Sequence, residues 1–204
     1  MNPVSNEDDR TPQPVARAGG LGLKEIIAVV VVAVVFGFIF WVMDQAWTSL
    51  SVAMGPLGDL AQNVLIGVWF LAAPVAVFIV RRPGAGILAE LVASVVEVVF
   101  LGNPVGPILF VVGLVQGIGS EAAFAVTGYR RYGLPIFLAS GAGASLLSFA
   151  FSTLRFGWWG QSLFGVRLVV QMCSGILLGG VAAWLLCRAL ARSGVLRDLP
   201  AGRQ

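Results

Sequence analysis

Histidine is absent from the 204 residues of this chain, and cysteine occurs only twice. Histidine is the commonest metal ligand and the usual general base near neutral pH. Its absence argues against haem ligation by histidine, charge-relay proteolysis and most metal chemistry within a membrane. Cys173 and Cys187 both lie in apolar helical stretches, which favours buried thiols over a disulfide framework. We therefore expect no catalytic residue, no metal and no cofactor, and a protein that is not an enzyme.

Charge is scarce as well. Charged residues make up 11% of the chain and hydrophobic residues 58%, whereas a soluble domain is about 25% charged. These proportions are typical of an integral protein of the lipid bilayer, and they predict no nucleic-acid partner. The sequence also lacks the Walker A pattern GxxxxGK[ST]. The energy for any transport would therefore come from a partner or an ion gradient.

Six apolar runs of roughly 20 residues, the length that spans a bilayer, divide the chain. They cover residues 24–49, 61–80, 84–101, 105–127, 134–154 and 163–191. The sequence therefore predicts an all-α membrane protein, a bundle of six transmembrane helices within residues 23–196. Residues 1–22 are polar and rich in Pro and Gly, which predicts a disordered cytoplasmic tail, and residues 197–204 form a second cytoplasmic tail.

Basic residues indicate how this bundle is oriented. By the positive-inside rule the side that carries most of them is cytoplasmic, which places both termini there. The residues on that side are Arg17, Lys24, Arg81, Arg82, Arg130, Arg131, Arg188, Arg192 and Arg197. Two basic residues, Arg155 and Arg167, lie on or near the other side, together with Asp44 and Asp59.

The third apolar run contains two glutamates, Glu90 and Glu97. Seven residues make about two helical turns, so both side chains project from one face, roughly 10 Å apart along the axis. An ionisable group at the bilayer centre costs on the order of 2.5–3.5 kcal/mol, so this face should point into the bundle. The alternative is that each glutamate is protonated or paired for packing alone.

Other spans place polar groups at matching depths, where they would converge on a cavity open to the outside. The set comprises Trp69, Asn103, Gln116, Glu121 and Arg167, the last of which begins a stripe with Gln171 and Ser174. Carboxylates and amides accept hydrogen bonds from amino groups, and an indole offers stacking or cation–π contact. This inventory suits a small, flat, amine-bearing or cationic heterocycle. Packing in the core is an equally good interpretation of Trp69.

Small residues form a second pattern. Ala33 and Gly37 make a small-xxx-small pair in the first span, which permits close helix contact within the chain or with a partner.

Two stretches resemble a known family. They are "WFLAAPVAVFIVRRPGAGILAELVASVVEVVFLGNPVGP" (69–107) and "GLVQGIGSEAAFAVTGYRRYGLP" (113–135). Together, "RRPGA", the two glutamates before "LGNPVGP", and "QGIGSE" resemble the YkoE-type S components of energy-coupling factor (ECF) transporters, a family assigned to thiamine or its hydroxymethylpyrimidine precursor. The resemblance runs from about residue 24 to residue 196.

The resemblance implies a substrate-capture subunit of an ABC-type vitamin importer in the bacterial plasma membrane. Such a subunit takes the vitamin from outside and works with a transmembrane coupling subunit and two cytoplasmic ABC ATPases. Ala33 and Gly37 would then contact the coupling subunit. Residues 50–60 would form a gate, with Gly and Pro56 as hinge residues. Glu97 is the expected main substrate carboxylate, and Glu90 and Glu121 are secondary candidates.

Rival interpretations remain at this point. One is a stand-alone, ion-coupled permease for a small solute, with Glu90, Glu97 and Glu121 as a proton relay. Others are a membrane enzyme or a structural subunit. The sequence leaves open whether the ligand is thiamine, its pyrimidine half or a related heterocycle, and whether the ATPases are shared.

Overall fold

The computed structural model describes residues 21–196 and 199–202, and every regular element in those residues is helical. The predicted tail over residues 1–22 lies almost wholly outside the described residues, as does part of the second tail. The elements are α1 (Leu23–Ala53), η1 (Gly55–Leu60), α2 (Ala61–Leu65), η2 (Ile66–Phe70), α3 (Ala72–Val80), α4 (Ala85–Val95), η3 (Val96–Phe100), α5 (Ile108–Val126), α6 (Leu134–Phe156), α7 (Phe164–Ser174), η4 (Gly175–Ala182), α8 (Ala183–Arg192) and η5 (Pro200–Gly202).

These elements form six helical segments, which confirms the all-α class. Five segments are long and apolar enough to cross a membrane: Leu23–Ala53, Gly55–Val80, Ile108–Val126, Leu134–Phe156 and Phe164–Arg192. The remaining segment, α4 with η3, is shorter than the roughly 20 residues that span a bilayer. It contains Glu90 and Glu97, and both are buried as predicted.

Glycine and proline set the ends of the segments where the sequence places them. α3 ends at Val80 and is followed by Arg81, a non-glycine residue whose φ is 55°; the chain then passes through Pro83 to Gly84, whose φ is 84°. α6 has Pro135 in its first turn and ends at Gly157, whose φ is 65°. Because positive φ is easy for glycine and proline fixes a helix start, these residues stop one helix and begin the next.

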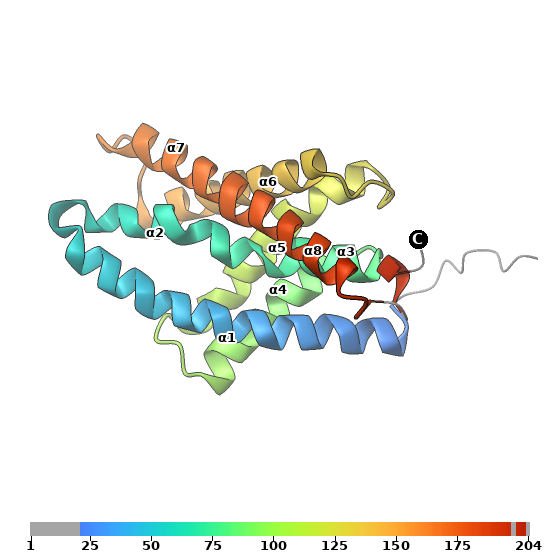
Figure 1. The fold of residues 1–204 in the computed structure, drawn as a ribbon. Helices are drawn as coiled ribbons and strands as arrows, with labels where there is room; N and C mark the ends of the chain where they lie inside the picture. The colour runs from blue at the N-terminus through green and yellow to red at the C-terminus, as the bar shows by residue number, and fades with distance from the viewer. Residues whose placement is uncertain (1–20, 197–198, 203–204) are drawn as a thin grey trace, which may run out of the picture.

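The segments pack as a bundle in which the first residues of α1 and the last of α8 lie at the same end (Figure 1). α4 packs between α1 and α5, and α6 packs against both α5 and η4. Near the end that holds the termini, Phe78, Phe124 and Phe137 form an aromatic core, with the last two ring centroids 5.4 Å apart. The cavity described next lies toward the opposite end, near the last turns of α1 and α6.

Candidate functional site

A cavity of about 210 Å³ lies among α1, α2, η2, α5 and α6. Its volume is below the roughly 300–1,000 Å³ typical of pockets for drug-sized ligands, so it suits a small molecule. Its polar groups are one carboxyl, two amides, two indoles and one guanidinium. The lining residues are Asp44, Trp47, Gln62, Ile66, Trp69, Val105, Leu109, Val112, Gln116, Arg155 and Phe156.

Two of the predicted site residues, Trp69 and Gln116, line this cavity. Gln116 is 4% exposed, and no hydrogen bond joins its amide to another described residue. Buried polar groups in proteins are normally hydrogen-bonded, so a buried amide that faces a cavity without an internal partner is available to a ligand. Arg155 stands over the ring of Phe156 at 4.8 Å from its centroid, at the rim of the same cavity.

Asp44 connects the cavity to Glu97. The Asn103 Nδ2 donates a hydrogen bond to Asp44 Oδ2 and lies 3.4 Å from Glu97 Oε1. Asn103 Oδ1 in turn accepts from the backbone N–H of Val105, which fixes the amide. Glu97 is 2% exposed and lies in the π-helical turn η3, a type of helix distortion that is frequent at functional sites. Of the two acids, Asp44 is the one that lines the cavity.

Glu90 has a partner of its own. Its Oε1 accepts the backbone N–H of Ala73 at 2.9 Å, in the first turn of α3. An N–H in the first turn of a helix has no acceptor within that helix, so Glu90 satisfies an otherwise unpaired donor. Glu90 is therefore placed to hold α3 against α4.

Glu121 caps the start of α4. Its carboxylate accepts hydrogen bonds from the backbone N–H of Gly84, from Ile87 N at 2.9 Å and from Tyr129 Oη at 2.8 Å. A carboxylate at a helix start satisfies unpaired N–H groups and complements the helix dipole. Its contacts lie in and beside the turns that flank α4 and follow α5, whereas the cavity lies among other residues. We therefore revise the prediction that Glu121 contacts the substrate.

The turn beside Glu121 contains the only two tyrosines of the chain. Burial and the hydrogen bond to Glu121 raise the pKa of Tyr129 well above its ordinary value. Burial raises the pKa of Tyr132 to about 12, although the nearby Arg81 guanidinium lowers it. Arg81 lies 4.6 Å from the centre of the Tyr132 ring. Both phenols therefore stay neutral at physiological pH.

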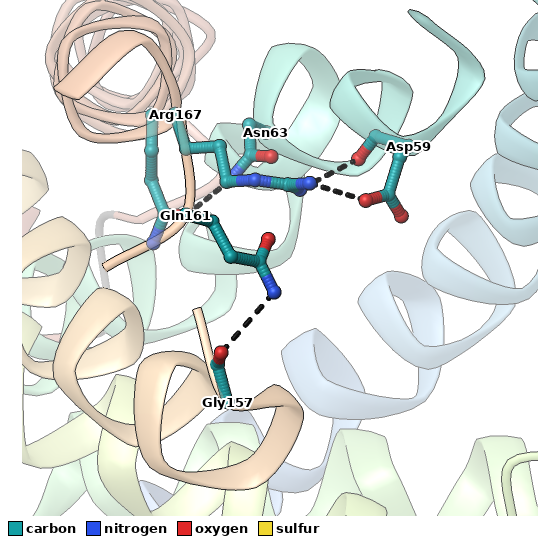
Figure 2. A network of polar contacts seen from close by, with 6 residues as sticks. Asp59, Asn63, Gly157, Gln161 and Arg167 are labelled. Carbon is teal, nitrogen blue, oxygen red and sulfur yellow. Dashed lines mark hydrogen bonds and ion pairs between the residues drawn. The ribbon is translucent and has the colours of Figure 1, made fainter. Parts of the chain in front are cut away.

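Arg167 pairs with the segment that follows α1. Its guanidinium forms an ion pair with the Asp59 carboxylate and donates to the Asp59 carbonyl at 3.3 Å, as Figure 2 shows. It also lies 4.7 Å from the centre of the Trp158 ring. The Arg167 side chain is 4% exposed and that of Asp59 is 74% exposed. These partners account for Arg167 outside the cavity, which revises its prediction as a substrate residue.

The polar stripe on α7 continues below this ion pair. Asn63 Nδ2 donates to Gln171 Oε1 at 2.8 Å, and Ser174 Oγ donates to the Val64 carbonyl at 2.6 Å. The Gln171 amide also donates to Ser145 O at 3.1 Å. The stripe therefore joins α7 to α2 and α6, and it holds the back of the α2–η2 segment whose other side lines the cavity.

Ala33 and Gly37 lie inside the chain. Both are buried, and a Cβ added to Gly37 would lie 2.7 Å from Val96 Cβ and 2.8 Å from Ala93 O. The small face of α1 therefore packs against the α4–η3 segment, and a partner protein would reach it only by displacing that segment. Between Ile27 and Val42 the exposed residues of α1 are all apolar: Ile27, Val30, Val31, Val34, Val35, Phe38 and Val42.

Comparison with known proteins identifies the family of this chain. Residues 24–147 match the family model described as "ABC-type cobalt transport system, permease component". The chain is 33% identical over 184 residues to YkoE of Bacillus subtilis (strain 168), named there as a candidate HMP/thiamine permease, and covers 90% of it. A crystal structure of an S component of an ECF transporter superposes with a TM-score of 0.83 at 32% identity, covering 90% of this chain and 92% of that one. This chain belongs to the ECF S components.

The S component is a multi-pass membrane protein and a transporter subunit of a non-enzymatic family, as the sequence predicted. As an S component it couples with an ECF module. Among the polar and tryptophan residues of the cavity, sequence reasoning left out Asp44, Trp47, Gln62 and Arg155. Asp44 carried a usable signal, because a carboxylate inside a long apolar run marks a functional position.

Proposed function

We propose that this S component captures thiamine or its hydroxymethylpyrimidine precursor in the cavity and delivers it inward. The resemblance to YkoE supports the class of ligand. The observation that carries the proposal is the pair formed by Asp44 and the unpartnered amide of Gln116, both at the cavity wall beside Trp69. A carboxylate, an amide and an indole face match an aminopyrimidine, which has an amino donor, ring acceptors and a flat aromatic surface.

The same groups favour an organic ligand over a bare metal ion. A metal site needs several converging carboxylate, thiolate or imidazole ligands, and the cavity lining supplies one carboxyl together with a guanidinium and aromatic rings. Asp44 takes over the role that the sequence suggested for Glu97, because Asp44 lines the cavity and Glu97 lies behind it. The alternative function, an ion-coupled permease, would use Glu90, Glu97 and Glu121 as a proton relay. Glu90 and Glu121 instead accept hydrogen bonds from backbone N–H groups away from the cavity, which does not favour that relay.

The cavity faces outward in the proposed orientation. Its residues on α1 and α6, including Asp44 and Arg155, lie in the parts of these helices far from the end that holds the termini. Basic residues concentrate at the end with the termini, which supports a cytoplasmic location for that end. Delivery then requires a transmembrane coupling subunit and two cytoplasmic ABC ATPases, in the bacterial plasma membrane.

The test is direct binding to the purified protein in detergent, by calorimetry or by quenching of tryptophan fluorescence. We expect saturable binding of thiamine or hydroxymethylpyrimidine. Asp44→Asn should weaken it roughly 10- to 100-fold, the scale of a hydrogen bond to a charged group. Glu25→Gln is the matched control, because Glu25 pairs with Arg82 at the opposite end of the bundle. A folded protein that binds neither compound would refute the proposed function.

A second variant separates binding from folding. Gln116→Leu removes an amide that has no hydrogen-bond partner among the described residues, so binding should weaken about tenfold while the melting temperature is unchanged or higher. Gln171→Leu removes an amide of the same type that is hydrogen-bonded to Asn63 and Ser145. We therefore expect the main effect of Gln171→Leu to be a lower melting temperature. Loss of binding in Gln171→Leu with full binding in Gln116→Leu would contradict the assignment.

Transport by the chain alone distinguishes the S component from a stand-alone carrier. Vesicles that contain only this protein should bind the ligand without accumulating it, with or without a pH gradient. Accumulation should require the coupling subunit, the ATPases and ATP. Uptake by the chain alone, driven by a pH gradient, would instead support an ion-coupled permease.

A further inference from the structure

Two carboxyl groups share one amide at the edge of the cavity. Asn103 Nδ2 donates to Asp44 Oδ2 and lies 3.4 Å from Glu97 Oε1, so one amide nitrogen contacts both carboxyl groups and holds them side by side. Glu97 is almost fully buried in η3, whereas Asp44 is partly exposed and lines the cavity. The pair therefore has an inner member and a member that reaches the ligand.

The surroundings of this pair contain little positive charge. In the described residues the ion pairs with a distance of 4 Å or less are Arg82–Glu25 and Arg167–Asp59, and neither involves this pair. The neighbouring helix α4 adds a third acid, Glu90. The segment Ala61–Val80 contains no titratable residue, and the nearest cation on the cavity wall is Arg155. Two adjacent carboxylates in a poorly hydrated site repel each other strongly, so such pairs retain one proton between them.

We propose that Glu97 retains this proton, donates its O–H to Asp44, and so leaves a single negative charge on Asp44 directed at the cavity. Glu97 is the inner acid, where an ionised carboxylate would be least hydrated, and Asp44 also receives the Asn103 amide. Glu97 is then a positioning residue that acts through Asp44. The ligand meets one fixed carboxylate, which matches one cationic or amino group.

This inference deepens the proposed function, since it concerns the charge state of the same site. It separates two roles for Glu97. If Glu97 were an ionised ligand-binding group, neutralising it would weaken binding as much as neutralising Asp44. If Glu97 is a neutral donor, the amide of Glu97→Gln still supplies an N–H donor to Asp44 and preserves the arrangement.

The binding test compares three variants with thiamine and hydroxymethylpyrimidine as probes. We expect Glu97→Gln to bind within about threefold of wild type, while Glu97→Leu and Asp44→Asn each lose about tenfold or more. Melting temperatures in detergent identify variants that fail to fold, and Glu97→Gln is the conservative variant that keeps the test valid. Equal losses in Glu97→Gln and Asp44→Asn would overturn the proposal.

Two further readouts respond to the proton itself. Difference infrared spectroscopy should show the C=O stretch of a protonated carboxylic acid at neutral pH that disappears in Glu97→Gln and persists in Glu90→Gln. Calorimetry in two buffers of different ionisation enthalpy should show no net proton release when ligand binds. An infrared spectrum without that band, or release of about one proton per ligand, would overturn the proposal. The infrared result requires no ligand, so it stands or fails independently of the proposed function.

Discussion

Replacing Glu121 with alanine provides the sharpest test of its structural role. In wild type the carboxylate accepts two backbone N–H groups at the start of α4 and the Tyr129 hydroxyl. A hydrogen bond to a charged group contributes about 1.5–3 kcal/mol, and the partial exposure of these donors lets water replace some of it. We therefore expect Glu121→Ala to lower the free energy of unfolding by about 3–4 kcal/mol. Glu121→Gln, which keeps an acceptor oxygen, should lose about half as much.

The assay is unfolding in mixed detergent micelles, followed by helical circular dichroism. Tyr129→Phe removes one of the three donors and should cost about 1 kcal/mol. Combined with Glu121→Gln it should cost less than the sum of the two, because the partners are shared. Ligand affinity of folded Glu121→Gln should equal that of wild type. Unchanged stability together with lost affinity would refute the capping role and restore Glu121 as a substrate residue.

Three other predictions concern the described contacts. Gly37→Ala forces a Cβ against Val96 and Ala93, so it should lower the unfolding free energy by about 1–3 kcal/mol; unchanged stability would show that α1 and α4 separate easily. Asp59→Asn removes the negative charge beside the buried Arg167 but keeps an oxygen that can accept its hydrogen bond, and because Asp59 is mostly exposed the cost should be only about 1–2 kcal/mol in the same assay. In a spectrophotometric titration the two tyrosines should ionise above their ordinary value of about 10, Tyr132 at about 12. The contribution of the two neutral tyrosines to stability is fully present below about pH 10 and is lost as the pH rises toward 12. Detection of tyrosinate in the folded protein at pH 10 would contradict this prediction.

The helical segments were predictable from the sequence, because apolar runs and the glycine and proline residues between them determine helix position through neighbouring residues alone. The run expected over residues 134–154 is α6 (Leu134–Phe156), and that over 105–127 is α5 (Ile108–Val126). The short third run was predictable as a helix that buries its glutamates, because ionised groups are excluded from lipid. The sequence also predicted that this run spans the membrane, but α4 and η3 together are shorter than an ordinary span and are not among the five candidate spans in the described residues.

The site was less predictable, because depth along a helix does not reveal which neighbour a side chain meets. Arg167 and Gln116 were both expected near the cavity, yet Arg167 on α7 meets Asp59 on η1. Glu121 was expected to face the substrate, and its partners are N–H groups on the turn into α4. The sequence set Asp44 near the outer side of the first run (24–49) but gave it no role, whereas α1 (Leu23–Ala53) places it beside the cavity. These relations depend on the packing between helices, which single-chain periodicity does not specify.

Two buried glutamines show how such a bundle separates structural from ligand-binding polarity. Gln171 has its carbonyl and amide engaged by Asn63 and Ser145, and it joins three helices. Gln116, at similar burial, has its amide toward the cavity and no hydrogen-bond partner in the described part of the chain. An amide that faces the cavity and has no partner in the bundle is free to form its hydrogen bonds with a ligand there. The same reasoning applies to Asp44, whose charge is balanced by donors on one side and open to the cavity on the other. The polar groups that face the cavity and keep capacity for a further hydrogen bond are therefore the ones from which affinity for the ligand arises.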